Sequence, residues 1–142
     1  MKIHLKATAL ITAACISMLL FPTYLSQPAY AADSIKNIWI VTDEIKVPAK
    51  DGHGKLEVYR WDPGTIVLHQ GDRVMLHIYG VKGKSHPFEL EGYNVKGIAM
   101  QGQVTKIMFT ADKAGTFPFI CLTHRDKEHD GPMIAYFEVL PK

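Results

Sequence analysis

The chain has 142 residues, of which 47% are hydrophobic and 21% charged, and its formal net charge is +2. This composition excludes a disordered or collagen-like chain, and 2 cysteines are too few for a disulfide-dense miniprotein. The length predicts one folded domain.

The first 31 residues have the pattern of a secretory signal peptide. Lys2 and Lys6 precede an apolar run over Ala7–Phe21, and Ala29–Ala31 has the small residues of a cleavage site. The apolar run is short for a bilayer span. We therefore expect removal of residues 1–31 and an exported, periplasmic or extracytoplasmic domain over residues 32–142. An uncleaved N-terminal anchor is the alternative.

Removal of that segment leaves 14 basic and 14 acidic residues, so the mature chain has no net charge. No basic cluster remains, which argues against a nucleic-acid partner. The mature chain keeps one cysteine, Cys121, which has no partner for an internal disulfide. In an oxidising compartment a lone thiol is a liability unless something occupies it, so Cys121 is the first indication of function.

After residue 31 the sequence alternates between short runs of branched and aromatic residues and breaks at Gly, Pro and Asp. Such runs predict strands, and no segment has a sustained helical period with caps. The alternation is clearest where Val74, Leu76 and Ile78 share one face. The pattern predicts an antiparallel β-sandwich. The expected strands are Ile35–Val41, Leu56–Trp61, Thr65–Leu68, Arg73–Tyr79, Pro87–Leu90, Val104–Thr110, Thr116–Ile120 and Ile134–Leu140.

Most of the candidate metal ligands lie in one segment, which contains Cys121, His124, His129 and Met133. This segment joins two predicted strands, so the sheet fixes both of its ends. His86, after a Gly-containing turn, adds an imidazole from upstream. A thiolate with two imidazoles and a weak axial thioether is the mononuclear copper site of electron-transfer proteins. The sequence therefore predicts one copper ion.

Each candidate also has a purely structural interpretation. Cys121 could be a core thiol and Met133 a core methionine, while His86 could hydrogen-bond a turn and His124 could be an imidazole at the solvent edge. Their concentration in a single inter-strand loop favours ligation. The remaining histidines and tryptophans that fall in strand patterns are assigned structural roles: His69, His77, Trp39 and Trp61.

These motifs resemble those of the cupredoxins, small exported copper proteins with an upstream His ligand and a Cys…His…Met loop near the C-terminus. The resemblance extends from Leu56 to Pro141 and is carried by Ser85–Phe88, Phe109–Phe117 and Cys121–Met133. It implies an all-β fold, a Greek-key β-sandwich of about seven or eight antiparallel strands, with one mononuclear copper site.

The loop departs from the common cupredoxin form because it contains two histidines. The spacing Cys121-x2-His124 is similar to the spacing between the Cys and His ligands of plastocyanin. The spacing His129-x3-Met133 is the usual one between the His and Met ligands. We expect His129 and Met133 to be direct ligands. His124 is a candidate for two roles, a further ligand or a solvent-edge imidazole that tunes the site without binding the ion.

Two further relatives bear on this loop. The binuclear copper domain of terminal oxidases is excluded because Arg125 stands where its second cysteine would be. The loop of nitrosocyanin, Cys-x2-His-x4-His, matches Cys121, His124 and His129, but its upstream ligand is Glu and His86 takes that place here. In that alternative His124 is the more important ligand, His129 takes the axial place and Met133 is a core residue.

Three functions fit this site, and we rank them as an electron carrier, a copper-handling protein for storage or resistance, and a small copper redox enzyme. The first implies transient docking of a redox partner protein, no nucleic acid, and no membrane span after signal removal. The sequence leaves the oligomeric state open.

Overall fold

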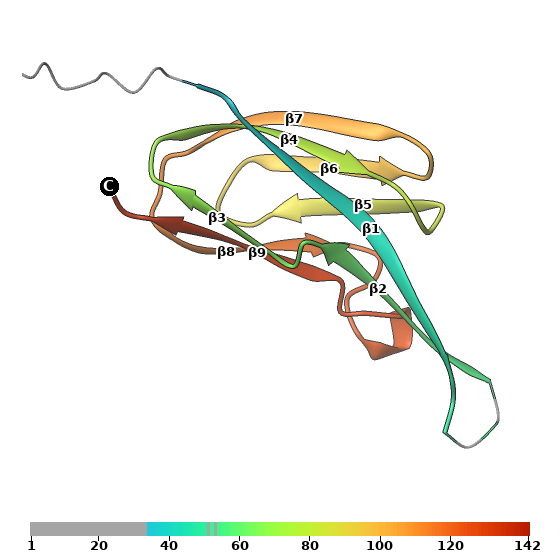
Figure 1. Cartoon of the computed structure of the whole chain (residues 1–142). Coiled ribbons are helices and arrows are strands. Elements are labelled where there is room, and N and C mark those ends of the chain that lie inside the picture. The colour runs from blue at the N-terminus through green and yellow to red at the C-terminus, as the bar shows by residue number, and fades with distance from the viewer. Residues whose placement is uncertain (1–33, 51, 53) are drawn as a thin grey trace, which may run out of the picture. The chain divides into compact units, whose positions relative to one another are not determined.

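The computed structural model describes residues 34–50, 52 and 54–142, which form nine strands in two sheets and one short 3₁₀ helix (Figure 1). The signal-peptide prediction falls outside these residues. Among them, no helix has the length and apolar character needed to cross a membrane. The elements are β1 (Lys36–Pro48), β2 (Lys55–Asp62), β3 (Thr65–His69), β4 (Asp72–Tyr79), β5 (Ser85–Leu90), β6 (Val95–Met100), β7 (Val104–Ala111), β8 (Gly115–Cys121), η1 (Lys127–His129) and β9 (Ile134–Leu140).

The strands form a four-stranded sheet of order β2-β1-β4-β7 and a five-stranded sheet of order β3-β9-β8-β5-β6. The predicted all-β sandwich of the cupredoxin type is therefore confirmed. Two details differ from the expectation: there are nine strands, and the pairs β1–β4 and β3–β9 are parallel. Both parallel pairs join strands that are distant in sequence, and a local residue pattern does not encode such pairings.

The core lies between the sheets and contains the inward residues of alternating strands. Val74, Leu76 and Ile78 of β4 are all 0% exposed, as the alternation predicted. An aromatic cluster fills the layer beside them, with ring centroids 4.7 to 6.1 Å apart. Its members are Trp61, Phe88, Phe119 and Phe137. The core therefore supports β5 and β8, the two strands that carry His86 and Cys121.

Strand β6 is not evident from the sequence because Gly97 interrupts its run of strand-forming residues. A Cβ at this position would lie 2.7 Å from Cζ of Phe88, so the glycine allows the Phe88 ring to pack against the β6 backbone.

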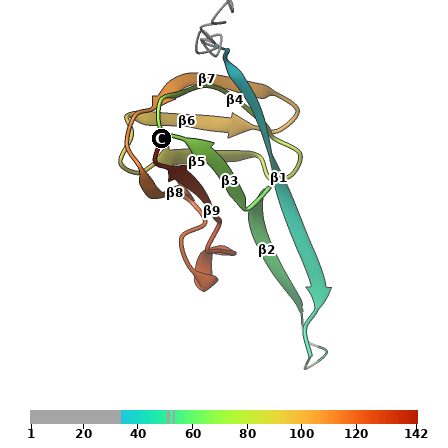
Figure 2. The same cartoon turned by 60° about the vertical axis from the view of Figure 1, so that its left-hand side comes forward.

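Strand β1 continues to Pro48 instead of ending at Val41. Charged residues in this extension hide the strand pattern in the sequence. In the structure these residues form ion pairs, because Lys46 pairs with Glu44 and with Glu57 of β2. The far parts of β1 and β2 project from the sandwich as a two-stranded ribbon (Figure 1 and Figure 2).

Candidate metal centre

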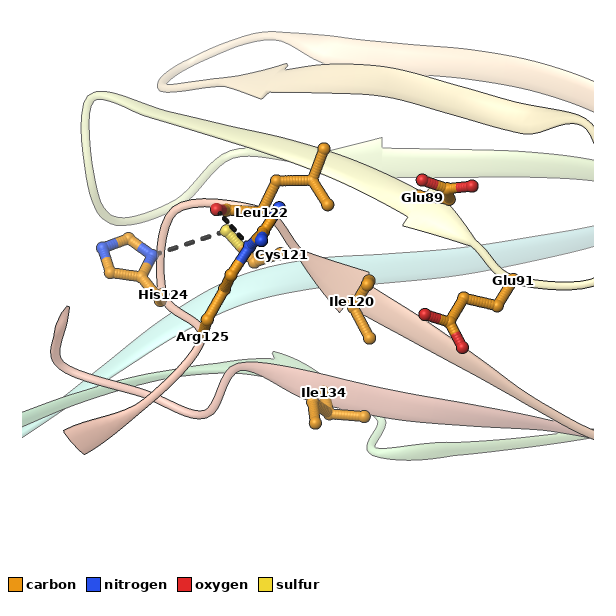
Figure 3. Close-up of a pocket in the computed structure, with 8 residues that line it drawn as sticks. All are labelled: Glu89, Glu91, Ile120, Cys121, Leu122, His124, Arg125 and Ile134. Carbon is orange, nitrogen blue, oxygen red and sulfur yellow. Dashed lines mark hydrogen bonds between the residues drawn. The ribbon is translucent and has the colours of Figure 1, made fainter.

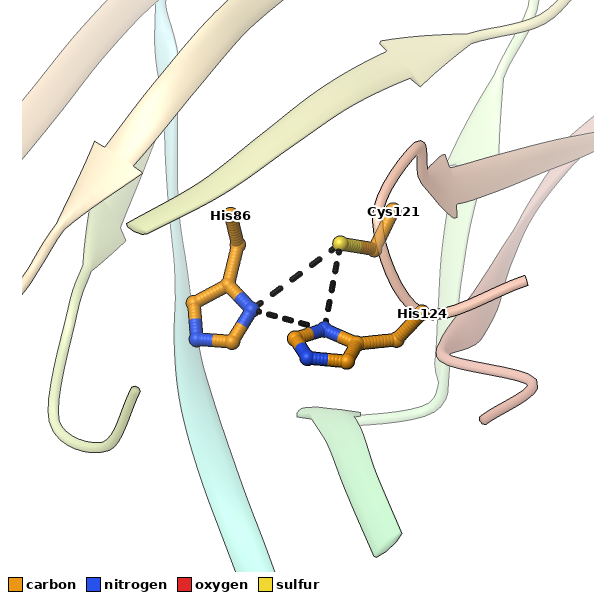
Figure 4. Close-up of side chains that lie close together, drawn as sticks. All are labelled: His86, Cys121 and His124. Atoms are coloured by element: carbon orange, nitrogen blue, oxygen red, sulfur yellow. Dashed lines mark hydrogen bonds between the residues drawn. The ribbon is translucent and has the colours of Figure 1, made fainter. Parts of the chain in front are cut away.

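Three potential donor atoms meet at one end of the sandwich (Figure 4). His86 is at the start of β5, Cys121 ends β8, and His124 is in the loop that follows. The Nδ1 atoms of the two histidines are 3.2 Å apart, and Sγ of Cys121 is 3.5 Å from Nδ1 of His124 and 3.9 Å from Nδ1 of His86. Residues separated by 35 positions in sequence thus present their donors to a common point.

The size and chemistry of this triangle fit a metal ion. A point equidistant from the three atoms lies about 2 Å from each of them, close to the usual lengths of metal–imidazole and metal–thiolate bonds. A soft sulfur with two imidazole nitrogens suits copper, and a carboxylate is absent from the cluster in the part of the chain described here.

The ring of His86 is held in the orientation that ligation requires. Its Nε2–H donates to the backbone carbonyl of Lys82 at 2.7 Å, so the neutral ring keeps a lone pair on Nδ1. Burial lowers the pKa of His86, against the opposing effect of that hydrogen bond. The neutral, ligating form is therefore favoured at neutral pH. Metal-binding histidines commonly donate their second N–H to a backbone carbonyl in this way.

The ring of His124 lies against Tyr59 of β2, with centroids 4.4 Å apart and an angle of 25° between the planes. Burial lowers the pKa of His124, and the neighbouring His86 adds to this effect. Both histidines are thus kept neutral, with lone pairs available for a metal.

Met133 is 0% exposed and is joined to the other candidates through the backbone. Its N–H donates to the carbonyl of His124 at 2.9 Å, and its carbonyl accepts from the N–H of Cys121 at 3.0 Å. These bonds close the loop between β8 and β9. His86, Cys121, His124 and Met133 are arranged as a potential single copper site.

His129 lies apart from this group. Its side chain is 63% exposed, and its ring pairs with the carboxylate of Asp126, which also caps η1. The structure brings His124 to the donor cluster and leaves His129 in solvent, so it favours the Cys-x2-His alternative over the ligand set that we preferred from the spacing.

Sequence reasoning missed three groups that shape the centre: Tyr59, the Lys82 carbonyl and Gly83. Tyr59 was only one of several aromatic strand residues, and its contact with His124 depends on how β2 packs. A backbone carbonyl carries no sequence signal. Gly83 did have a sequence signal, since it ends a Gly-containing turn. Its φ is +75°, and a Cβ at this position would lie 2.2 Å from Nε2 of His86.

A pocket of about 400 Å³ has two of the donors in its lining (Figure 3). Cys121 itself is only 1% exposed, so the pocket reaches the centre mainly along His124. The other lining residues are Glu89, Glu91, Ile120, Leu122, Arg125 and Ile134.

Comparison with known proteins agrees with the fold described above. A family model described as a cupredoxin-like domain matches residues 15–135. No curated protein sequence matches the chain significantly.

Several solved structures are similar in fold. Copper nitrite reductase from Nitrosomonas europaea superposes with a TM-score of 0.59 at 19% identity, covering 77% of this chain and 42% of that one. The multicopper oxidase mgLAC gives 0.60 at 17% identity, covering 77% and 40%. A copper-containing nitrite reductase from Thermus scotoductus SA-01 gives 0.59 at 20% identity, covering 77% and 28%. The chain thus spans less than half the length of each of these proteins.

Proposed function

This chain belongs to the cupredoxin-like domain family, and on that premise we propose that it is an exported protein that transfers single electrons through one bound copper ion. The observation that carries the proposal is the convergence of His86, Cys121 and His124 on one point. A copper ion held there would supply one-electron chemistry by alternating between Cu(I) and Cu(II). Met133 would be the fourth residue that holds the ion.

The residues around the centre support this role because they restrict its motion. The Leu122 N–H donates to the carbonyl of Pro87 at 2.7 Å, which ties the residue after Cys121 to the residue after His86. The two backbone bonds of Met133 fix the loop at its other end. A ligand set that moves little between oxidation states keeps the reorganisation energy of electron transfer small.

His124 is the proposed point of electron exit. It is the least buried of the three donors, and the loop between β8 and β9 that carries it lies at the end of the sandwich (Figure 1). We propose that a redox partner protein docks there transiently.

The proposal is tested by copper loading of the purified chain. We expect one copper per chain at this centre, an intense visible thiolate-to-copper band, and loss of that band in Cys121→Ser. Copper should also protect Cys121 from alkylation, since its lone pairs are then engaged with the metal. A band that survives in Cys121→Ser, or equal alkylation with and without copper, contradicts the assignment.

Copper handling is the second candidate function, and the pocket beside Cys121 and His124 is the observation that favours it. A small chelator that enters this pocket would lie next to His124. Rapid transfer of Cu(I) from the loaded protein to a chelator supports handling, whereas retention over hours supports the electron carrier.

A further inference from the structure

His86 is a buried residue whose ring is held by an exposed loop. Its Nε2–H donates to the carbonyl of Lys82 at 2.7 Å, and Lys82 lies in the loop between β4 and β5. The side chains of Val81 and Lys82 are exposed, so they do not fix this loop to the core. Loop backbone of this kind is more mobile than the strands that it connects. A carbonyl that orients a metal ligand from such a loop therefore needs an anchor of its own.

Thr42 of β1 supplies that anchor from inside the sandwich, where its side chain is 0% exposed. The Thr42 hydroxyl donates to the carbonyl of Lys82 at 2.8 Å. Its Oγ1 also accepts from the N–H of Val81 at 2.9 Å and from the N–H of Lys82 at 3.0 Å. A hydroxyl has one donor and two acceptor positions, and all three are used here. One side chain thus fixes three successive peptide groups of the loop.

The position of Thr42 along β1 explains why it can do this. The backbone ladder between β1 and β4 ends at the pair Val41 and Tyr79, and Thr42 is the next residue of β1. Backbone polar groups that are buried beyond the end of a ladder need other partners. The Thr42 hydroxyl provides them for the start of the loop, so it continues the link between the two chain segments beyond the sheet.

We propose that Thr42 is a positioning residue for His86. Its hydroxyl fixes the Lys82 carbonyl, which in turn fixes the Nε2–H tautomer of the His86 ring and the direction of the Nδ1 lone pair. The inference rests on the proposed copper centre, to which His86 contributes Nδ1. Groups that orient a ligating histidine are commonly worth about 10- to 100-fold in metal affinity. Without the hydroxyl, the carbonyl moves with the loop and the imidazole loses its fixed orientation.

The test compares two substitutions of Thr42 in the full chain. Thr42→Val replaces the hydroxyl with a methyl group of similar shape, whereas Thr42→Ser keeps the hydroxyl. Thr105→Val is the matched control, because the Thr105 hydroxyl also donates to a backbone carbonyl, that of Ile98, at 2.7 Å. Long-range proton–nitrogen NMR of the metal-free chain reports the His86 tautomer. We expect a mixture of tautomers in Thr42→Val and the Nε2–H form in the unmodified chain and in the other two variants.

Competition with a copper chelator gives the second readout. Thr42→Val should lose about tenfold or more in copper affinity, whereas Thr42→Ser and Thr105→Val should stay within about threefold of the unmodified chain. An unchanged His86 tautomer in Thr42→Val, or an equal loss of affinity in Thr42→Ser, overturns the proposal. If the unmodified chain binds no copper, the proposed function fails, while the tautomer measurement still decides the role of Thr42.

Amide exchange in the unmodified chain decides the case in which Thr42→Val does not fold. The N–H groups of Val81 and Lys82 should be protected from exchange with deuterium, although both residues are exposed, because they donate to Thr42. Copper should slow their exchange further, since ligation of His86 stabilises the same chain of hydrogen bonds. Unprotected N–H groups at both positions, or protection that copper leaves unchanged, overturn the proposal.

Discussion

His124 and His129 show how a single residue position decides ligation. Both follow Cys121 in the same loop. His124 precedes the short helix η1, whereas His129 is the last residue of η1. The Asp126 carboxylate binds the His129 ring and backbone, so this histidine stabilises the loop from the solvent side.

We predict that His124→Ala damages copper binding more than His129→Ala. Loss of His124 removes a donor, and we expect affinity to fall by more than about tenfold. His129→Ala should change stability by about 0.5 kcal/mol or less, because the Asp126 pair is exposed. The copper-dependent rise in melting temperature measures both effects. A larger loss in His129→Ala would restore the ligand set that the spacing favoured.

Gly83 is predicted to control the orientation of His86. Gly83→Ala should displace the His86 ring from the Lys82 carbonyl, since the new Cβ would be 2.2 Å from Nε2. We expect about 1–3 kcal/mol of destabilisation together with weaker copper binding. Gly102→Ala is the matched control, because Gly102 has a φ of +74° with nothing within 4 Å. Denaturant unfolding separates backbone strain, which both variants share, from the contact with His86. Equal copper affinity in the two variants would refute this role.

At the scale of elements, the ribbon of β1 and β2 carries a charged network next to the centre. The Tyr59 hydroxyl donates to Glu57 at 2.9 Å and to Glu44 at 3.2 Å, and Lys46 pairs with both carboxylates. The hydrogen bond with Glu57 first, and that with Lys46 second, lower the pKa of Glu44 from 4.5 to about 2. A network of this kind orients Tyr59 against His124.

The lowered pKa of Glu44 predicts an acid-dependent loss of stability. A carboxyl whose folded pKa is below its unfolded value stabilises the fold above about pH 4.5, and this contribution disappears as the pH falls towards 2. Glu44→Gln should therefore flatten the decline in melting temperature between about pH 5 and 3. Glu138→Gln on β9 serves as the control. An unchanged slope in Glu44→Gln would show that the network contributes nothing to stability.

The elements also show what the sequence could predict. Eight strands could be located because alternation and turn residues are local signals. Cys121 and Met133 stand out because ligand types cluster in their loop, whereas His86 stands out through the upstream Ser85–Phe88 motif. The parallel neighbours of β1 and β3, the β6 strand with its Gly97, and the choice between His124 and His129 depend on packing between distant segments. The residue pattern of one segment does not show which distant segment packs against it.

At the scale of the whole molecule, the described domain is joined to an N-terminal segment whose pattern predicts export. We expect the mature protein to begin at Ala32. Mass spectrometry of the protein recovered from the extracytoplasmic fraction measures this directly. A chain that retains residues 1–31 would support the uncleaved anchor instead.

Strand β1 changes its neighbours along its length, and this has a consequence for how the molecule opens. From Lys36 to Val41 it pairs with β4, whereas from Val41 to Pro48 it pairs with β2. The second half is a two-stranded ribbon, which is marginally stable by itself in water. We expect amide protons after Val41 to exchange with deuterium much faster than those before it, as in local unfolding of a weak segment. Uniform exchange along β1 would contradict this. Tyr59 belongs to the ribbon, opposite Glu44, so each opening of the ribbon would uncover His124. The rate at which the ribbon opens would then set how often solvent and small molecules reach the metal centre from this side.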